Sequence, residues 1–180
     1  MFAAVLNRPG SLGPQTGKRS RGELPLLALE RRTAAGAAEE IGSLDAAAYR
    51  TFNMVIGDAN GAWFVRGSGS GRPRVIGLDG GVHIVTAHDP NDPNSARARA
   101  QLPRFQAAPP PNPDREDWSG WAGLLGDRTG PRGAAINVPI EGGFGTVCSS
   151  LAGVSADGRV RWLFAAGPPD RTPFAPVTLP

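Results

Sequence analysis

The sequence predicts an α+β protein of one domain, residues 1–180, with more strand than helix. Three observations lead to this prediction. Short apolar runs alternate with turn residues between positions 51 and 86, where Asn60-Gly61 and Gly80-Gly81 mark two hairpins. Ala- and Leu-rich segments follow helix-capping residues between positions 20 and 49. Gly and Pro account for 25 and 18 residues of the chain, which favours short elements joined by many turns.

The N-terminal part is expected to hold one strand and three short helices. Residues 2–6 form an uninterrupted apolar run, which predicts a buried strand. Ser20 and Glu23 have the spacing of a capping box, so we expect a helix there with Pro25 in its first turn. Thr33 and Ser43 are candidate caps for two further helices, over residues 33–41 and 43–49.

The rest of the chain alternates again between strand and helix patterns. A four-stranded antiparallel meander is predicted over residues 51–58, 62–67, 74–78 and 82–86. Helices are predicted at 95–105, capped by Asn94 or Ser95, and at 118–125. Residues 144–155 and 159–165 flank Asp157-Gly158 and predict a last hairpin. The Pro-rich residues 167–180 are expected to form an extended tail.

Charge and composition exclude several partners. The formal net charge is +3 with a pI of about 10.0, but 18 of the 19 basic residues are Arg, which a GC-rich coding bias would produce. The densest basic cluster is Arg8, Lys18, Arg19 and Arg21, with no aromatic residue among them, so we predict no nucleic-acid partner. No apolar run is long enough to span a bilayer, and the predicted location is the cytoplasm.

The single cysteine and the two histidines give little catalytic chemistry. Cys148 lies in an alternating apolar segment, so we expect a buried, unreactive strand residue. His83, His88 and Asp92 have a spacing that matches no recognised metal site. We therefore predict neither a metal nor a cofactor. Four tryptophans are expected to pack in the core or to line an apolar pocket, namely Trp63, Trp118, Trp121 and Trp162.

Six segments, taken in order, resemble one family, the NRDE family, also called the transport and Golgi organisation protein two family. They are Leu6-Asn7-Arg8, Ser20-Arg21-Gly22-Glu23-Leu24, Phe52-Asn53-Met54-Val55-Ile56-Gly57-Asp58, Gly81-Val82-His83-Ile84-Val85-Thr86, Phe144-Gly145-Thr146-Val147-Cys148-Ser149-Ser150 and Asp157-Gly158-Arg159-Val160. Each segment alone is weak, and their order over residues 2–165 carries the resemblance.

The resemblance implies a fold like that of the N-terminal-nucleophile hydrolases, a four-layer sandwich in which two stacked antiparallel sheets are flanked by helices. It also implies a Met-Cys start and an Asn-Arg-Asp-Glu signature, and this sequence has neither. We therefore expect a chain that is truncated at its N-terminus by several tens of residues. Ala87 stands where the resemblance implies an oxyanion-holding Asn, which further disfavours hydrolysis.

The function expected from this resemblance is that of a non-catalytic member of the family. The alternatives are a small-ligand binding or trafficking protein for haem or acyl-lipid, or, in full-length form, a cysteine hydrolase of C–N amide bonds. A homo-oligomer through an exposed sheet edge is also expected. The pocket candidates are Arg21, Asn53, His83, Thr86 and Thr146.

Overall fold

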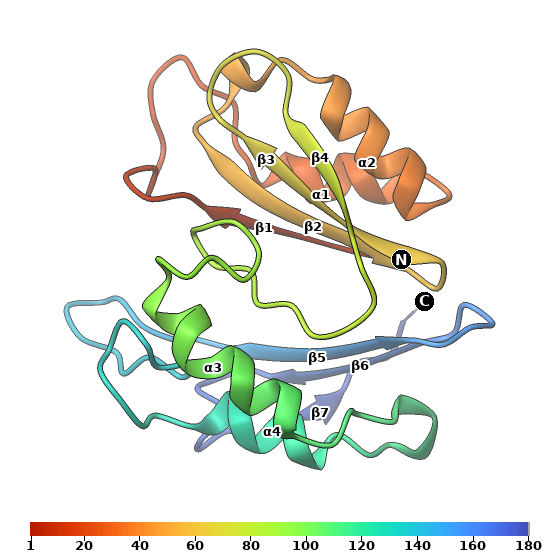
Figure 1. Ribbon diagram of the computed structural model, residues 1–180, viewed down its shortest axis with the longest axis vertical. Helices are drawn as coiled ribbons and strands as arrows, with labels where there is room; N and C mark the ends of the chain where they lie inside the picture. Colours follow the sequence, from red (N-terminus) through yellow and green to blue (C-terminus); the bar gives the residue numbers. More distant parts are fainter. Residues whose placement is uncertain (180) are drawn as a thin grey trace. The chain divides into compact units, whose positions relative to one another are not determined.

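The computed structural model describes residues 1–179, without the side chain of Ser119. The chain divides into two compact units, Met1–Asp92 and Pro93–Pro180, and each unit contains one antiparallel sheet and its own helices (Figure 1). The α+β class predicted from the sequence is therefore confirmed. The two units are described separately below.

The sheet of the first unit has four strands in the order β1-β2-β3-β4. These are β1 (Phe2–Asn7), β2 (Phe52–Asp58), β3 (Gly61–Gly67) and β4 (Arg74–Leu78). Strands β2 and β3 are joined by the turn Ala59-Asn60, and Asp58 pairs with Gly61. The first strand lies antiparallel to β2, with Asn7 opposite Phe52, so the segments after β1 and before β2 meet at the same end of the sheet.

Two helices, α1 (Glu23–Leu29) and α2 (Ala34–Ser43), cover one face of this sheet, and a 3-10 turn, η1 (Ala46–Ala48), leads into β2 (Figure 1). The apolar residues between the helices and the sheet are fully shielded from solvent and form the core of the unit. They include Leu24, Ala28, Ala37, Ile41, Tyr49, Phe52, Met54, Ile56 and Val65.

The predicted helix caps are partly confirmed. Thr33 caps α2, because its hydroxyl accepts a hydrogen bond from Gly36 N at 3.1 Å. The cap before η1 is Asp45, which accepts from Ala47 N at 2.9 Å, so the prediction of a helix capped by Ser43 is wrong. Ser43 is instead the last residue of α2, and the 3-10 turn begins only at Ala46.

The capping box predicted at Ser20 and Glu23 does not form. The N-cap residue of α1 is Gly22, and the helix start has no capping hydrogen bond from a side chain. The carboxylate of Glu23 instead accepts from Tyr49 Oη at 2.6 Å and pairs with Arg19 at 2.7 Å. These charged and buried partners outweigh a reciprocal bond to the backbone at the helix start. Pro25 lies in the first turn, as predicted.

The strand predicted over residues 82–86, the last of the predicted meander, does not form. This segment is irregular, and the fourth strand of the sheet is β1. The reason is local: Ile84 N donates to the side chain of Asn91 at 2.9 Å, and Ile84 O accepts from Asn91 N at 2.9 Å. These bonds occupy the backbone groups that a neighbouring strand would use. Gly81, at φ +130°, turns the chain away from β4.

Strand β1 forms where the apolar run predicts it, but at the edge of the sheet. Its side chains alternate between exposed and half-buried, and Phe2 is 40% exposed. The expected buried strand is therefore an edge strand with one neighbour among the described residues. An uninterrupted apolar run does not distinguish these two environments.

The second unit contains the hairpin predicted near the C-terminal end. Strand β5 (Ser149–Val154) pairs with β6 (Val160–Ala165), and a short strand β7 (Ala175–Pro176) adds to β6. The first strand begins at Ser149 rather than at Phe144, and the tail predicted as extended contributes two residues to the sheet. Residues 138–147 form turns instead, because Thr146 Oγ1 accepts from Val138 N at 2.9 Å.

The helices of the second unit are α3 (Ala96–Ala107), the 3-10 turn η2 (Pro113–Arg115) and α4 (Ser119–Gly126). Ser95 caps α3 by accepting from Ala98 N at 3.2 Å, as predicted. The two α-helices meet through Phe105 and Trp121, whose rings lie edge to face with centroids 5.1 Å apart. Among the described residues no helix has both the length and the apolar character that crossing a membrane requires.

Cys148 is exposed, which contradicts the predicted buried position. It lies one residue before β5 begins, in the turn segment and not within the strand. Its alternating apolar neighbours therefore have no sheet to bury them at this point; Val147 is 64% exposed.

Candidate functional site

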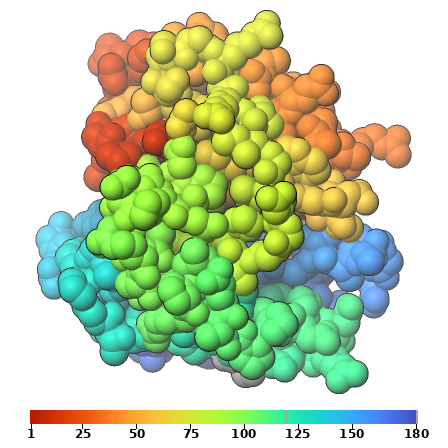
Figure 2. All heavy atoms as spheres, viewed as in Figure 1, coloured from red at the N-terminus to blue at the C-terminus, as the bar shows by residue number. Residues whose placement is uncertain are grey.

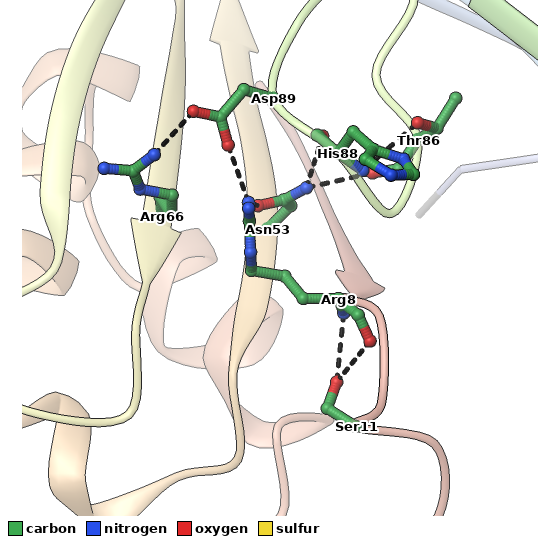
Figure 3. Close-up of polar contacts among 7 residues, drawn as sticks. All are labelled: Arg8, Ser11, Asn53, Arg66, Thr86, His88 and Asp89. Carbon is green, nitrogen blue, oxygen red and sulfur yellow. Dashed lines mark hydrogen bonds and ion pairs between the residues drawn. The ribbon is translucent and has the colours of Figure 1, made fainter. Parts of the chain in front are cut away.

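The side chain of Asn53 is the centre of a polar network near the start of β2 (Figure 3). Asn53 is fully buried. Its Oδ1 accepts from Arg8 Nη1 at 2.5 Å, and its Nδ2 donates to the carbonyls of Thr86 and His88 at 2.9 and 2.6 Å. The buried amide is thus satisfied on both sides, and it fixes the irregular segment after β4 to the sheet.

Asp89 supplies the negative charge of the same network. One carboxylate oxygen pairs with Arg8 Nη1 at 2.7 Å and the other with Arg66 Nη1 at 2.6 Å. Figure 3 shows Asp89 between these two arginines, which come from the end of β1 and from β3. Each guanidinium offsets part of the charge of the carboxylate, so this arrangement fastens a loop and leaves no reactive acid.

Two further predicted residues, His83 and Thr86, form hydrogen bonds within the irregular segment after β4. His83 Nε2 lies 2.9 Å from Asp79 O, and its Nδ1 lies 3.0 Å from Asn91 Nδ2. Thr86 Oγ1 accepts from His88 N at 3.2 Å. Both side chains are engaged with neighbours in sequence. No group of three His, Cys, Asp or Glu residues suited to a metal occurs in the described part of the chain.

Ser11 connects this network to a second group of cations. It is buried, and its hydroxyl accepts from Arg8 N at 3.0 Å and from Arg21 Nη1 at 2.9 Å. The same oxygen lies 2.8 Å from Arg8 O and 2.9 Å from Thr51 O, which also accepts from Arg21 at 2.9 Å. These bonds hold the guanidinium of Arg21 in one position beside the loop that follows β1.

A pocket of about 420 Å³ opens on this side of the first unit. Part of its wall is the N-terminal segment, whose red atoms lie at the surface of the unit in Figure 2. Four basic side chains line the pocket, and among its described lining residues there is no Asp or Glu. The lining consists of Val5, Asn7, Gly13, Pro14, Gln15, Lys18, Arg19, Ser20, Arg21, Gly22 and Arg50.

Arg50 organises the loop that forms the wall of this pocket. Its Nη2 donates to Gly10 O at 2.8 Å and its Nη1 donates to Leu12 O at 2.8 Å. Nη1 also lies 3.3 Å from the carbonyls of Gly13 and Pro14. Gly10 and Gly13 have φ values of +73° and +79°, and this backbone conformation directs the carbonyls toward the guanidinium.

The positive charge of the pocket is poorly compensated. Arg19 pairs with Glu23, whereas Arg21, Arg50 and Lys18 have no carboxylate partner among the described residues. Burial lowers the pKa of Arg21, and the neighbouring positive charge of Arg50 lowers it further. Four positive charges therefore face one carboxylate, and an anion entering the pocket would relieve their repulsion.

The two remaining sequence candidates lie in the second unit. Thr146 Oγ1 lies 3.4 Å from Ile136 O and stabilises the turn before β5. Cys148 is a free, exposed cysteine. A crevice of about 540 Å³ in this unit is lined mainly by apolar groups, including Trp118, Trp162 and Phe174.

The structure thus brings Asn53 and Thr86 together. His83 contacts Asp79 and Asn91 instead, and Arg21 lies in a separate basic pocket joined to the network through Ser11. Arg50, Asp89 and Ser11 were not predicted as site residues. The signal that reveals Arg50 is its position just before β2, which lies beside the end of β1 once the two strands pair. No protein-family model matches the sequence, and neither does any curated protein.

Proposed function

We propose that this chain binds a small anionic ligand in the basic pocket and catalyses no reaction on it, as a relative of the NRDE family. The observation that carries the proposal is the uncompensated charge of Lys18, Arg21 and Arg50 around a pocket of about 420 Å³. Pockets of this volume are typical of small-molecule sites. Loop carbonyls hold Arg50 in place without neutralising its positive charge.

The family assignment rests on the order of the six segments given above. Each unit supplies an antiparallel sheet with helices, which are the parts that an N-terminal-nucleophile-hydrolase-like sandwich requires. Stacking of the two sheets is part of the proposal. The absence of catalysis is proposed because Ala87 offers no oxyanion donor.

The resemblance suggests two ligand classes, haem and acyl-lipid, and both carry acidic groups. Carboxylates or phosphates on either ligand would pair with the guanidinium of Arg21. The apolar side chains of Val5 and Pro14, which also line the pocket, would contact the adjoining part of the ligand. The basic pocket would then fix the charged end and the orientation of the ligand.

The test is titration of the chain with haem, followed by absorbance, and with palmitate, followed by calorimetry. We expect at least one of them to bind, and we expect Arg21→Gln to weaken binding about tenfold or more because it removes a charge-assisted bond. Arg32→Gln, in the exposed turn between α1 and α2, should leave the affinity unchanged. Failure of both ligands to bind would contradict haem and acyl-lipid as the ligand classes, and equal binding by Arg21→Gln would contradict the basic pocket as the binding site. Hydrolysis of an N-acyl amide by the purified chain would contradict its non-catalytic part.

A further inference from the structure

The charge and the available donors of the basic pocket indicate which anion it prefers. A carboxylate carries one negative charge, and a phosphomonoester carries about 1.5 to 2 at neutral pH with three acceptor oxygens. The pocket has four cations and one neighbouring carboxylate, that of Glu23. A single carboxylate would leave most of this charge uncompensated, whereas a phosphate would offset about two of the remaining positive charges.

The hydrogen-bond donors also match a phosphate. Arg21 Nη2 has one partner among the described residues, Gly13 O, at a long 3.4 Å. Lys18 Nζ donates one proton to Ala47 O and keeps two. Arg19 uses Nε for Glu23, and its two terminal nitrogens have no hydrogen bond to the described residues. Three cationic groups thus retain donors, which is the number of terminal oxygens on a phosphomonoester.

Arg50 contributes in a different way. Its terminal nitrogens are bonded to the carbonyls of Gly10 and Leu12, so it acts on the ligand through its charge and not by direct contact. These bonds also lower the repulsion between the loop and an anion. The carbonyl oxygens point at Arg50, so their negative ends do not face the anion in the pocket.

We propose that the basic pocket binds the phosphate group of a small phosphorylated molecule, held by Lys18, Arg19 and Arg21 and favoured by the charge of Arg50. This inference rests on the proposed binding function and names its ligand class. A pocket of about 420 Å³ is far larger than one phosphate, so its remaining volume, beside Val5 and Pro14, receives the organic part of the ligand.

The experiment compares phenyl phosphate with benzoate by calorimetry at constant ionic strength, because the two probes share a ring and differ in the anionic group. We expect phenyl phosphate to bind about tenfold tighter or more, as charge-assisted bonds to three oxygens exceed those to two. Its affinity should rise between about pH 5 and 7 as the second phosphate proton, with a pKa near 6, is lost. Benzoate should show no such rise over this range.

Variants of the whole chain locate the site. Arg21→Gln and Lys18→Gln should each weaken phenyl phosphate binding about tenfold. Arg21→Lys should retain part of the affinity that Arg21→Gln loses. Arg32→Gln should bind like the wild type. Thermal unfolding of each variant separates lost binding from lost folding. Equal affinity for both probes would overturn the phosphate assignment and leave the anionic binding function standing. No binding of either probe, or binding unaffected by Arg21→Gln, would overturn both.

Discussion

Asn53 holds the irregular segment after β4 against the sheet with one side chain, where a further strand would use a row of backbone hydrogen bonds. Its amide takes up the carbonyls of Thr86 and His88, and its oxygen accepts from Arg8. We expect Asn53→Ala to lower the free energy of unfolding by about 2–3 kcal/mol, because buried polar groups lose their partners. Asn60→Ala, in the exposed turn after β2, should change it by less than about 0.5 kcal/mol. Denaturant unfolding measures both, and equal losses would argue against a special role for Asn53.

Individual residues also show what could and could not be predicted from the sequence. Asn53 and Arg21 were found from short segments that resemble a family. Asp89, Ser11 and Arg50 each have at least one partner that is distant in the chain, namely Arg8 for Asp89, Thr51 for Ser11 and Gly10 for Arg50. Such pairs depend on the register of β1 on β2, which no local pattern specifies.

At the scale of elements, close contact between β2 and β3 depends on Gly67. A Cβ at this position would lie 2.1 Å from Phe52 Cε1, and Phe52 is fully buried and cannot move aside. We therefore expect Gly67→Ala to destabilise the protein by about 1–3 kcal/mol through overpacking. Gly77→Ala on β4 is the matched control, since nothing lies within 4 Å of its added Cβ. A loss in the control as large as that in Gly67→Ala would show that strand flexibility, not packing, is responsible.

Strand β2 and helix α2 are joined by a carboxylate whose ionisation affects stability. Asp58 Oδ2 accepts from Ala34 N at 2.7 Å and Oδ1 accepts from Asn60 N at 2.8 Å. The bond from Ala34, followed by that from Asn60, lowers the pKa of Asp58 below its usual 3.8. The unfolded chain therefore takes up the proton at higher pH than the folded chain. The stabilisation is complete above the usual pKa and is lost as the pH falls below it.

Asp58→Asn isolates this contribution, because the amide keeps an acceptor and does not titrate. The free energy of unfolding of the wild type should decrease relative to that of the variant as the pH falls from about 5 to 2. Urea unfolding at several pH values measures the difference. A constant difference over this range would contradict the assignment.

The elements themselves were largely predictable, and the errors have a common cause. The hairpin at Asn60-Gly61 and the caps Thr33 and Ser95 formed as local patterns predict. Residues 82–86 were assigned to a strand from an apolar run after Gly80-Gly81, and Cys148 from an alternating segment. Side-chain bonds to backbone groups, at Ile84 and at Val138, occur in or near both segments in place of pairing with a neighbouring strand.

For the whole molecule, the prediction concerns self-association through the edge strand β1. It has one sheet neighbour among the described residues, and Phe2 is exposed. We predict concentration-dependent dimers through this edge, weakened by Ala4→Lys because two added charges would face each other. Ala35→Lys, the same change at an exposed position of α2, should not affect association. Sedimentation velocity measures both variants, and a monomer at all concentrations would refute the prediction.

The central claim, anion binding at the basic pocket, is tested most directly by the amide chemical shifts of the whole chain during titration with phenyl phosphate. We predict that the shifts that change first belong to the lining residues Gly13, Gln15, Ser20, Arg21 and Gly22, and that they saturate together as one site fills. Arg21→Gln should shift the saturation of these changes to about tenfold higher ligand concentration. Shifts that appear mainly around Trp118 and Trp162, or that never saturate, would contradict the claim.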